Sequence, residues 1–321
     1  MKTLVTGAAG FIGSHLCDEL LKLGHQVVAV DNLSTGNDVN VSTRCIKYIG
    51  PQWDICDFNT LCTQIMSSDI DVVFHVAALP RVQFSIANPM LTHCSNINGT
   101  LNILMACREF NIKRCVYSSS SSVYGNQKTL PITETMQPNP LSPYALHKWV
   151  GEEYCRLFHE LYGLETVSLR YFNIFGERQD PLSEYSCLIP KTIYKVLHNE
   201  SPVIYGDGET TRDFNHVSDV VNANILAATT NNQEMFGKVI NIGSGEAYSV
   251  NHVVYVIKSI AGKTAIKNIY TDPVIEAKHT RADNSLAKKL LRWEPQVSIA
   301  KGLTKTVDYF IKKANIHGQN E

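Results

Sequence analysis

The sequence predicts an α/β fold: a doubly wound parallel sheet followed by a smaller, mixed α/β lobe that covers a substrate. Short apolar runs alternate with helical patterns from the N-terminus to about residue 170, as in parallel sheets with crossover helices. Beyond residue 180, prolines and glycines divide the chain into shorter elements. With 321 residues, the chain has room for two domains. We expect one domain over residues 1–168 and a second over 169–321, partly interleaved because no low-complexity linker separates them.

Composition and charge exclude several classes of protein. The formal net charge is −1, and no basic run or basic–aromatic stripe suggests a nucleic-acid partner. No apolar run reaches membrane-spanning length, and Met1 and Lys2 lead directly into a predicted strand, so we expect a cytoplasmic protein. The nine cysteines form no C-x-x-C pair, which predicts reduced thiols and no metal site.

The first element is a strand, glycine turn and helix. Gly7, Gly10 and Gly13 follow a short apolar run, and leucines then recur at helical spacing from residue 16 to residue 23. Backbone N–H groups at a helix N-terminus attract anions, and glycine lets a pyrophosphate approach without meeting a Cβ. A second apolar run ends at Asp31, whose carboxylate can accept hydrogen bonds from both ribose hydroxyls and would repel a 2′-phosphate. The unit therefore favours NAD over NADP, with a purely structural loop as the alternative.

The next elements extend this site. The polar turn after Asp31 is placed to wrap the adenosine half of a cofactor. A short strand is expected to end at Asp54–Asp57, where an acid either holds the adenine amino group or caps the helix that begins near Phe58. The predicted strand 71–76 runs into small residues, which let the backbone lie against a nicotinamide ribose.

A serine run and a helix carry the expected chemistry. The predicted strand ending at Tyr117 leads into Ser118 to Ser122, at the strand end where ligands bind in open α/β sheets. Tyr144 and Lys148 lie one turn apart on one helix face. The ammonium and the positive nicotinamide would favour a phenolate, which could take a proton from a sugar hydroxyl while NAD takes the hydride. Ser120 would share that proton, and Lys148 would hold the nicotinamide ribose. An exposed helix face is the alternative, but the preceding glycine turn, acid and serine favour catalysis.

In this order, the motifs resemble the extended short-chain dehydrogenase/reductase family, and within it the NAD-dependent nucleotide-sugar 4-epimerases. The motifs are Thr6–Gly13, Asp31–Gly36, Asn96–Thr100, Ser118–Ser120, Tyr144–Lys148, Arg170–Asn173, Ile189–Lys191, Gly206–Gly208, Arg212–Phe214 and Ala282–Asp283. The resemblance implies a Rossmann domain with tightly held NAD, a C-terminal lobe that binds a UDP-sugar, and a homodimer joined through a helix bundle.

Residues and resemblance together predict two sets of contacts. The expected NAD-binding residues are Gly7, Gly10, Phe11, Ile12, Gly13, Asp31, Asn32, Ser34, Thr35, Gly36, Asp54, Ile55, Ala77, Ala78, Asn96, Ser118, Tyr144, Lys148 and Tyr171. The expected substrate-binding residues are Pro80, Ser120, Ser121, Ser122, Asn173, Cys187, Leu188, Val203, Tyr205, Arg212, Glu276 and Thr280. By resemblance, Arg212 clamps the diphosphate, Glu276 binds the uridine ribose, and Tyr205 belongs to a platform for the uracil. An ion pair of Arg212 with Asp213 or Asp219 is the structural alternative.

The serine run also distinguishes among reactions. Similar 4,6-dehydratases carry an Asp-Glu pair in this loop, and similar decarboxylases carry a glutamate just before the Val-Tyr. Ser121 and Ser122 stand at these positions and cannot serve as carboxylates. The resemblance therefore implies simple 4-epimerisation through a 4-keto sugar, without net redox change.

The expected substrate follows from residues near the sugar. Similar enzymes strict for glucose and galactose place a tyrosine where Thr280 stands, so Thr280 and Cys187 leave volume for an acetamido group. Asp180 would repel a C6 carboxylate. We expect UDP-N-acetylglucosamine and UDP-N-acetylgalactosamine as substrates, with UDP-glucose and UDP-galactose also turned over. Pro273 replaces a second phosphate-binding arginine, for which Lys278 would substitute less well.

Two alternatives remain open. One is a UDP-uronate 4-epimerase, in which Arg281 would meet the carboxylate. The other is a non-catalytic NAD-binding regulatory module. The intact Tyr144 and Lys148 argue against the second alternative, since such modules typically lose one of them.

Overall fold

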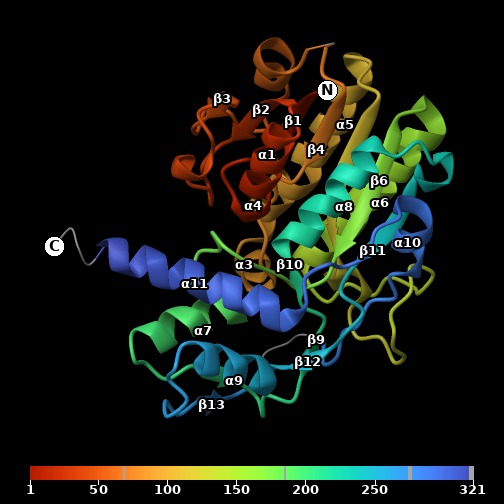
Figure 1. Ribbon diagram of the computed structural model, residues 1–321. Helices are drawn as coiled ribbons and strands as arrows, with labels where there is room; N and C mark the ends of the chain where they lie inside the picture. The colour runs from red at the N-terminus through yellow and green to blue at the C-terminus, as the bar shows by residue number, and fades with distance from the viewer. Residues whose placement is uncertain (68, 184–185, 274–276, 318–321) are drawn as a thin grey trace.

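A parallel sheet forms the centre of the molecule (Figure 1). The structure is a computed structural model that describes residues 1–67, 69–183, 186–273 and 277–317. The sheet has seven strands in the order β11-β6-β5-β4-β1-β2-β3, and every neighbouring pair is parallel. The strands are β1 (Lys2–Thr6), β2 (Gln26–Asp31), β3 (Ile46–Ile49), β4 (Val72–His75), β5 (Arg114–Ser120), β6 (Glu165–Tyr171) and β11 (Lys238–Ile242). The order reverses beside β1, and ligands bind at the carboxyl ends of the strands at such a reversal.

Helices cover both faces of this sheet. One face is packed by α1 (Phe11–Lys22), α8 (Val217–Thr229) and α10 (Ser285–Leu291), and the other by α5 (Gly99–Glu109) and α6 (Pro143–Tyr162). In β1, Val5 packs on the α1 side and Leu4 on the α5 side. Both faces of the strands are buried, which explains why they read as continuous apolar runs. The short helices α2 (Phe58–Thr60), α3 (Val82–Ala87) and α4 (Pro89–His93) lie in the connections.

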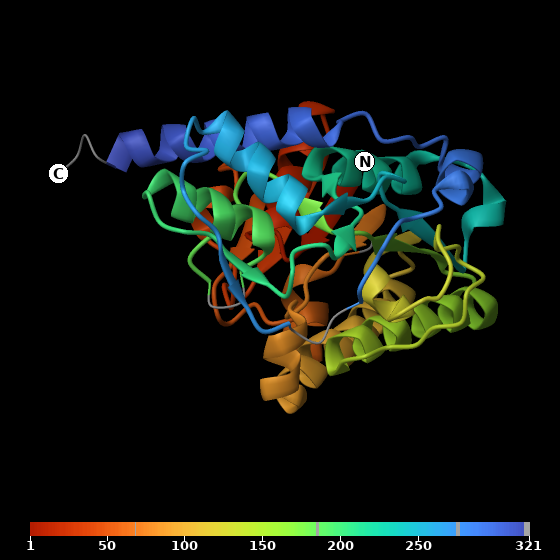
Figure 2. The same ribbon diagram turned by 90° about the horizontal axis from the view of Figure 1, so that it is seen from below.

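The smaller lobe is built on three helices with a shared apolar core. They are α7 (Leu188–Leu197), α9 (Val250–Ile260) and α11 (Ile299–His317). Short strand pairs complete the lobe or join it to the sheet: β7 (Ile174–Phe175) with β10 (Asn215–His216), β9 (Thr211–Arg212) with β12 (Tyr248–Ser249), and β8 (Val203–Tyr205) with β13 (Ile269–Thr271). Figures 1 and 2 show α7 and α9 packed together at one end of the sheet.

The chain passes between these two parts more than once. The predicted boundary at residues 168 and 169 falls inside β6, and α8, β11 and α10 belong to the sheet although they follow the first elements of the lobe. Helix α11 then packs against α7 and α9. Among the described residues, no helix combines the length and apolar character needed to cross a membrane.

Two predicted element boundaries differ from the structure. The strand expected to end at Asp54–Asp57 is β3, which ends at Ile49, and the acids lie in the connection that follows it. The serine run is not all loop, because β5 continues through Ser118, Ser119 and Ser120. Their pairing with Leu169, Arg170 and Tyr171 of β6 holds these serines in the sheet.

Candidate active site

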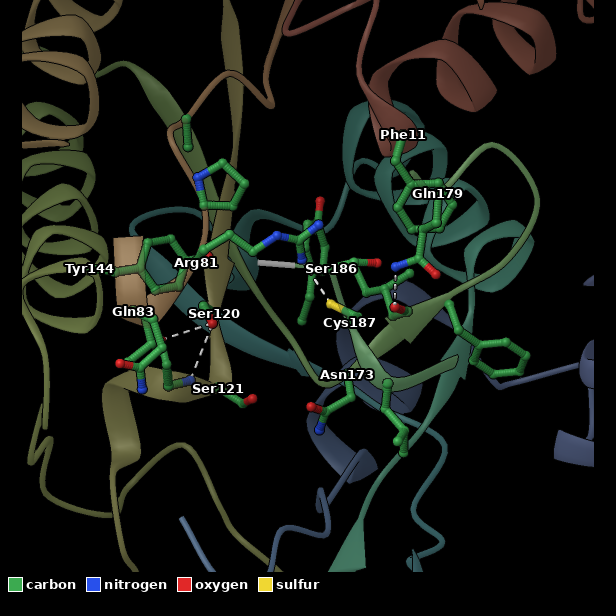
Figure 3. Close-up of a pocket in the computed structure, with 18 of the residues that line it drawn as sticks. Phe11, Arg81, Gln83, Ser120, Ser121, Tyr144, Asn173, Gln179, Ser186 and Cys187 are labelled. Atoms are coloured by element: carbon green, nitrogen blue, oxygen red, sulfur yellow. Dashed lines mark hydrogen bonds between the residues drawn. The ribbon is translucent and has the colours of Figure 1, made fainter. Parts of the chain in front are cut away.

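A cavity of about 1300 Å³ runs from the carboxyl edge of the sheet into the smaller lobe (Figure 3). All the predicted site residues except Gly36, Asn96 and Glu276 line it. Glu276 lies outside the described residues. The cavity thus brings together the glycine turn, the serine strand, the start of α6 and the sugar-side residues of the lobe.

The glycine turn is shaped to admit a phosphate group. Gly7 has φ +69°, and a Cβ there would lie 2.8 Å from the Ala77 Cα. A Cβ at Gly13 would meet the Gly7 carbonyl oxygen. Gly10 caps the N-terminus of α1, whose first turn carries no acidic residue. The turn therefore fits the pyrophosphate of a dinucleotide, with the positive end of the α1 dipole facing the cavity.

Two acids stand at the adenosine end of the cavity. Asp31 accepts hydrogen bonds from the Ala9 N–H at 2.9 Å and the Leu33 N–H at 2.7 Å, and burial raises the pKa of its carboxyl. Asp54 accepts one from the Asn32 side-chain amide at 2.9 Å. Asp57 instead caps α2 by accepting from the Thr60 N–H at 3.0 Å. The sequence left open whether an acid here lines the cavity or caps the helix. In the structure Asp54 lines the cavity and Asp57 caps α2.

Two residues expected to contact NAD do not line the cavity. A Cβ on Gly36 would lie 2.8 Å from the Ala9 Cβ, so Gly36 is needed where its loop crosses the glycine turn. The buried amide of Asn96 is fully occupied with Leu79, accepting from its N–H at 2.7 Å and donating to its carbonyl at 3.0 Å. Asn96 therefore braces the loop after β4. The sequence did not indicate this role, because it showed only a polar residue in a predicted helix.

A buried histidine extends this brace, which the sequence did not reveal. The Thr100 hydroxyl donates to the Asn96 carbonyl at 2.7 Å, so it accepts from His75 Nε2 at 2.9 Å. His75 Nδ1 then accepts from the Thr6 hydroxyl at 2.9 Å. Burial lowers the pKa of His75 to about 3, so the imidazole stays neutral. The chain of bonds fixes β1 and the end of β4 relative to each other.

Tyr144 and Lys148 enter the cavity from the start of α6. Ser142 caps this helix by accepting from the Ala145 N–H at 3.2 Å, and Pro143 occupies its first turn, which explains why it begins here. Lys148 Nζ donates to the Ser118 carbonyl at 2.6 Å and lies 6.0 Å from the Tyr144 ring centre. Burial lowers the pKa of Lys148 to about 8.

Several groups act on the ionisation of the Tyr144 phenol. Burial raises the pKa of its phenol, and the groups that oppose this effect are the Ser120 hydroxyl, by a hydrogen bond, and the Arg81 guanidinium, by its charge. Lys148 is not among the groups that oppose this effect in the chain alone, and its ammonium donates to the Ser118 carbonyl. Figure 3 shows Ser120 and Arg81 beside the Tyr144 ring.

Buried polar contacts hold the serine strand in place. Glu152 lies two turns after Tyr144 on α6; it accepts from the Ser119 hydroxyl and forms a two-point ion pair with Arg170 at 2.7 and 2.6 Å. Ser118 bonds the Tyr171 hydroxyl at 3.0 Å. These contacts attach β5 to β6 and to α6, so the three serines of β5 have fixed positions.

The side of the cavity where the sugar and the diphosphate are expected is formed by the smaller lobe. The Thr280 hydroxyl is within 3.3 Å of the Asp213 N–H and 3.5 Å of the Asn173 amide. Arg212 donates to the carbonyls of Thr211 and Lys278, each at 3.0 Å. Asp213 accepts from Ser244, Gly245 and Ala282, and Asp219 accepts from the Val297 N–H. These two carboxylates are thus occupied in joining backbone segments.

Some residues that line the cavity were not predicted. They include Arg81, Gln83, Gln179, Ser186, Lys191, Asp207 and His279. Arg81 could have been suspected, because it follows the carboxyl end of β4 by six residues, at the same edge of the sheet as the glycine turn. Asp180 and Arg281, which carried arguments about a sugar carboxylate, are not among the described residues that line the cavity. No group of three or more metal-binding side chains occurs in the described parts of the chain.

Comparison with known proteins identifies close relatives over the whole length. The model of the NAD dependent epimerase/dehydratase family matches residues 3–243. A putative UDP-glucose 4-epimerase of Methanocaldococcus jannaschii is 41% identical over 308 residues, covering 95% of this chain and 97% of the relative. A UDP-N-acetylglucosamine 4-epimerase from Methanobrevibacter ruminantium, solved with UDP-N-acetylmuramic acid, is 38% identical with a TM-score of 0.89, covering 97% and 98%. A UDP-glucuronic acid 4-epimerase from Bacillus cereus, solved with UDP-glucuronic acid and NAD, is 36% identical with a TM-score of 0.86, covering 98% and 100%.

Proposed function

Because this chain belongs to the NAD-dependent epimerase/dehydratase family, we propose that it interconverts UDP-N-acetylglucosamine and UDP-N-acetylgalactosamine, and also UDP-glucose and UDP-galactose. It is an NAD-dependent UDP-sugar 4-epimerase. The range of sugars is the part that needs support from the cavity itself.

The observation that carries the proposal is the pairing of Tyr144 with Ser120 at a strand end that lacks a carboxylate. Tyr144 takes the proton from the C4 hydroxyl, and Ser120 orients that hydroxyl. The glycine turn, Asp31 and Lys148 would hold NAD, which would supply reversible hydride transfer at C4. Ser121 and Ser122 also line the cavity and cannot act as the acid or base of an elimination. The serines at this strand end can therefore assist oxidation and reduction at C4, but they offer no carboxylate for a dehydration or a decarboxylation.

Lys148 and the glycine turn serve the cofactor. Lys148 Nζ lies at the Ser118 carbonyl, within the cavity, where it can hold a nicotinamide ribose. Gly7 and Gly13 leave space for the pyrophosphate, and Asp31 stands where the adenosine ribose is expected. These residues support NAD as the cofactor of this cavity.

The sugar side supports N-acetylated substrates. Thr280 and Cys187 line the cavity with short side chains, which leaves volume for an acetamido group. Arg281 does not line it, so the UDP-uronate alternative loses the contact on which it was based. The exposed Asp180 carboxylate accepts from the Leu182 N–H, so its expected repulsion of a carboxylate carries no weight either. A uronate carboxylate in the cavity would instead face Arg81, so UDP-glucuronic acid is one of the substrates to be tested.

A single NMR experiment compares the substrates. The purified protein is incubated separately with UDP-N-acetylglucosamine, UDP-glucose and UDP-glucuronic acid, and the sugar H4 and anomeric signals are followed. We expect the galacto signals to appear with the first two. Turnover of UDP-glucuronic acid alone would overturn the proposed substrates, and no turnover of any of the three would overturn the proposed function.

We further infer a homodimer. Leu146, Leu157 and Leu161 are exposed along α6 at helical spacing, and Trp149 and Tyr154 line a shallow apolar depression on the same helix. Apolar side chains that line a helix in this way are typical of a helix–helix interface. A bundle with the same helix of a second copy would cover them.

A further inference from the structure

Arg81 occupies a strained position at the cavity. It is the N-cap of α3 with φ +96° and ψ +117°, a backbone conformation that residues with a Cβ rarely adopt. Such a conformation is strained and persists where the surroundings enforce it, often at functional sites. The surroundings here are Pro80 and, one residue earlier, Leu79, which is held on both its N–H and its carbonyl by Asn96.

The short helix that follows Arg81 is attached directly to Tyr144. The Ser85 N–H donates to the Arg81 carbonyl at 3.1 Å, which begins α3. The Ser85 hydroxyl donates to the Val82 carbonyl at 2.7 Å and accepts from the Tyr144 N–H at 3.1 Å. The positions of the Arg81 turn and of the Tyr144 backbone are therefore linked by hydrogen bonds.

The guanidinium of Arg81 crosses the cavity toward the smaller lobe. Its Nη1 donates to the Cys187 Sγ at 2.7 Å, in the segment that precedes α7 (Figure 3). Within the described residues, this thiol is its hydrogen-bond partner and no carboxylate pairs with it. The acids among the described cavity residues lie elsewhere: Asp31 and Asp54 on the nucleotide side, and Asp207 and Glu209 in the smaller lobe.

The groups around the Tyr144 side chain come from several elements. Ser120 and Tyr117 come from β5, Lys148 from α6 itself, Cys187 from the segment before α7, and Arg81 from the turn before α3. His147 also lies on α6, but it packs edge-on against His93 of α4, with the ring centres 5.6 Å apart. Lys148 Nζ is hydrogen-bonded to the Ser118 carbonyl and lies 6.0 Å from the Tyr144 ring centre, and the Arg81 guanidinium is a second cation whose charge acts on the Tyr144 phenol.

We propose that Arg81 is a positioning residue for catalysis, whose strained turn holds a guanidinium beside Tyr144, where its charge favours the phenolate against the effect of burial. This inference rests on the proposed function, because it assigns Arg81 to the base of the 4-epimerase. The charge of Arg81 opposes the effect of burial on the Tyr144 pKa, in agreement with the geometry. The contact with Cys187 keeps the guanidinium from swinging out to solvent.

Four substitutions separate charge from backbone. Arg81→Lys keeps the cation, Arg81→Met removes it at similar length, and Arg81→Gly removes it while relaxing the positive φ. Arg292→Met is the matched control, since Arg292 is another arginine with positive φ, at +57°, and ends α10 away from the cavity.

For the NAD-bound enzymes, we expect the acidic limb of the kcat/KM pH profile to move up by about one unit in Arg81→Met and Arg81→Gly. That shift corresponds to about a tenfold loss at pH 7 that recovers at high pH. Arg81→Lys and Arg292→Met should stay close to the wild type, and KM should change less than kcat.

A second readout does not need turnover. The ionisation of Tyr144 is measured as the tyrosinate absorbance of the NAD-bound enzyme minus that of the Tyr144→Phe variant, with and without Arg81→Met. We expect Arg81→Met to move this titration to higher pH. An unmoved titration, or a loss of activity that is equal at every pH, would show a merely structural role for Arg81. If the wild type turns over no UDP-sugar but the titration still moves, the proposed function fails and the effect of Arg81 on Tyr144 stands.

Discussion

At the residue scale, the chemistry of the site depends on the few groups that act on the ionisation of the Tyr144 phenol. Burial opposes ionisation of Tyr144, so the proton must be drawn off by Ser120 and by positive charge close to the ring. The Lys148 ammonium is bonded to the Ser118 carbonyl and lies 6.0 Å from the centre of the ring. Thr280 lines the same cavity from the smaller lobe, and we propose that its size sets the room beside the sugar.

Replacing the base tests its role. Tyr144→Phe removes only the hydroxyl, so we expect turnover to fall at least about 100-fold while NAD remains bound. Initial rates and the amount of NAD that co-purifies with the protein measure the two effects. More than about a tenth of wild-type activity would contradict the assignment.

The sugar pocket can be narrowed at one position. Thr280→Tyr fills the volume proposed for the acetamido group, so turnover of UDP-N-acetylglucosamine should fall at least about tenfold more than turnover of UDP-glucose. Thr280→Ser keeps the hydroxyl without the added bulk and serves as the control. Equal losses on both sugars would refute the proposed gate.

His75 predicts an acid-sensitive stability. Its folded pKa of about 3 lies below the ordinary value of 6.5, so below pH 6.5 the unfolded chain binds a proton that the folded protein does not. Stability is therefore lost as the pH falls, by about 1.5 kcal/mol between pH 6.5 and 5 from this residue. Urea unfolding of the wild type and of His75→Gln at these two pH values measures the difference. An equal pH dependence in both proteins would exclude His75 as its source.

The sequence revealed the residues whose roles are local and concealed those whose roles depend on packing. Gly7 and Asp31 were identified because a strand, a turn and a helix adjacent in the chain determine their surroundings. The bonds of Asn96 to Leu79 could not be predicted, because Leu79 is brought to it only by the folding of the loop after β4. Arg81 was missed for the same reason, since its neighbours Tyr144 and Cys187 are far away in the chain.

At the element scale, α6 and β5 together hold the chemistry. Helix α6 carries Tyr144 and Lys148 into the cavity and, two turns later, Glu152 into a buried pair with Arg170 of β6. The predicted start of α6 was right because Ser142 and Pro143 are local signals. The extent of β5 was underestimated because serines are weak strand formers, and their pairing with β6 overrides that preference.

The buried pair predicts a large effect on stability. Glu152→Ala leaves the Arg170 guanidinium buried without its carboxylate, which should lower the free energy of unfolding by about 3–5 kcal/mol. Glu19→Ala is the control, because its pair with Lys22 is exposed and should contribute less than about 1 kcal/mol. Denaturant unfolding measures both, and a similar small loss in the two variants would contradict the importance of the buried pair.

At the scale of the whole molecule, the cavity is shared between the sheet and the smaller lobe. The alternation of strands and helices up to about residue 170 could be predicted because each element has its own periodicity. The return of β11 to the sheet could not, since nothing in residues 238–242 indicates which strand they will pair with. Both parts are needed, because Tyr144 comes from one and Thr280 from the other.

The proposed dimer can be tested at the surface of α6. Leu157→Asp places a charge in the lining of the apolar depression, so we expect light scattering to report a monomer where the wild type gives a dimer. Leu23→Asp, on the exposed end of α1, is the matched control and should leave the assembly unchanged. A monomeric wild type, or a dimer that persists in Leu157→Asp, would rule out this interface.

The most direct test of the account follows the hydrogen at C4. UDP-N-acetylglucosamine carrying deuterium at C4 is incubated with the enzyme in ordinary water, and the product is examined by NMR and mass spectrometry. If Tyr144 removes only the hydroxyl proton and the C4 hydride returns to the same sugar, UDP-N-acetylgalactosamine will retain the deuterium without accumulation of reduced cofactor. Loss of the deuterium to solvent, with epimerisation proceeding, would contradict oxidation and reduction at C4.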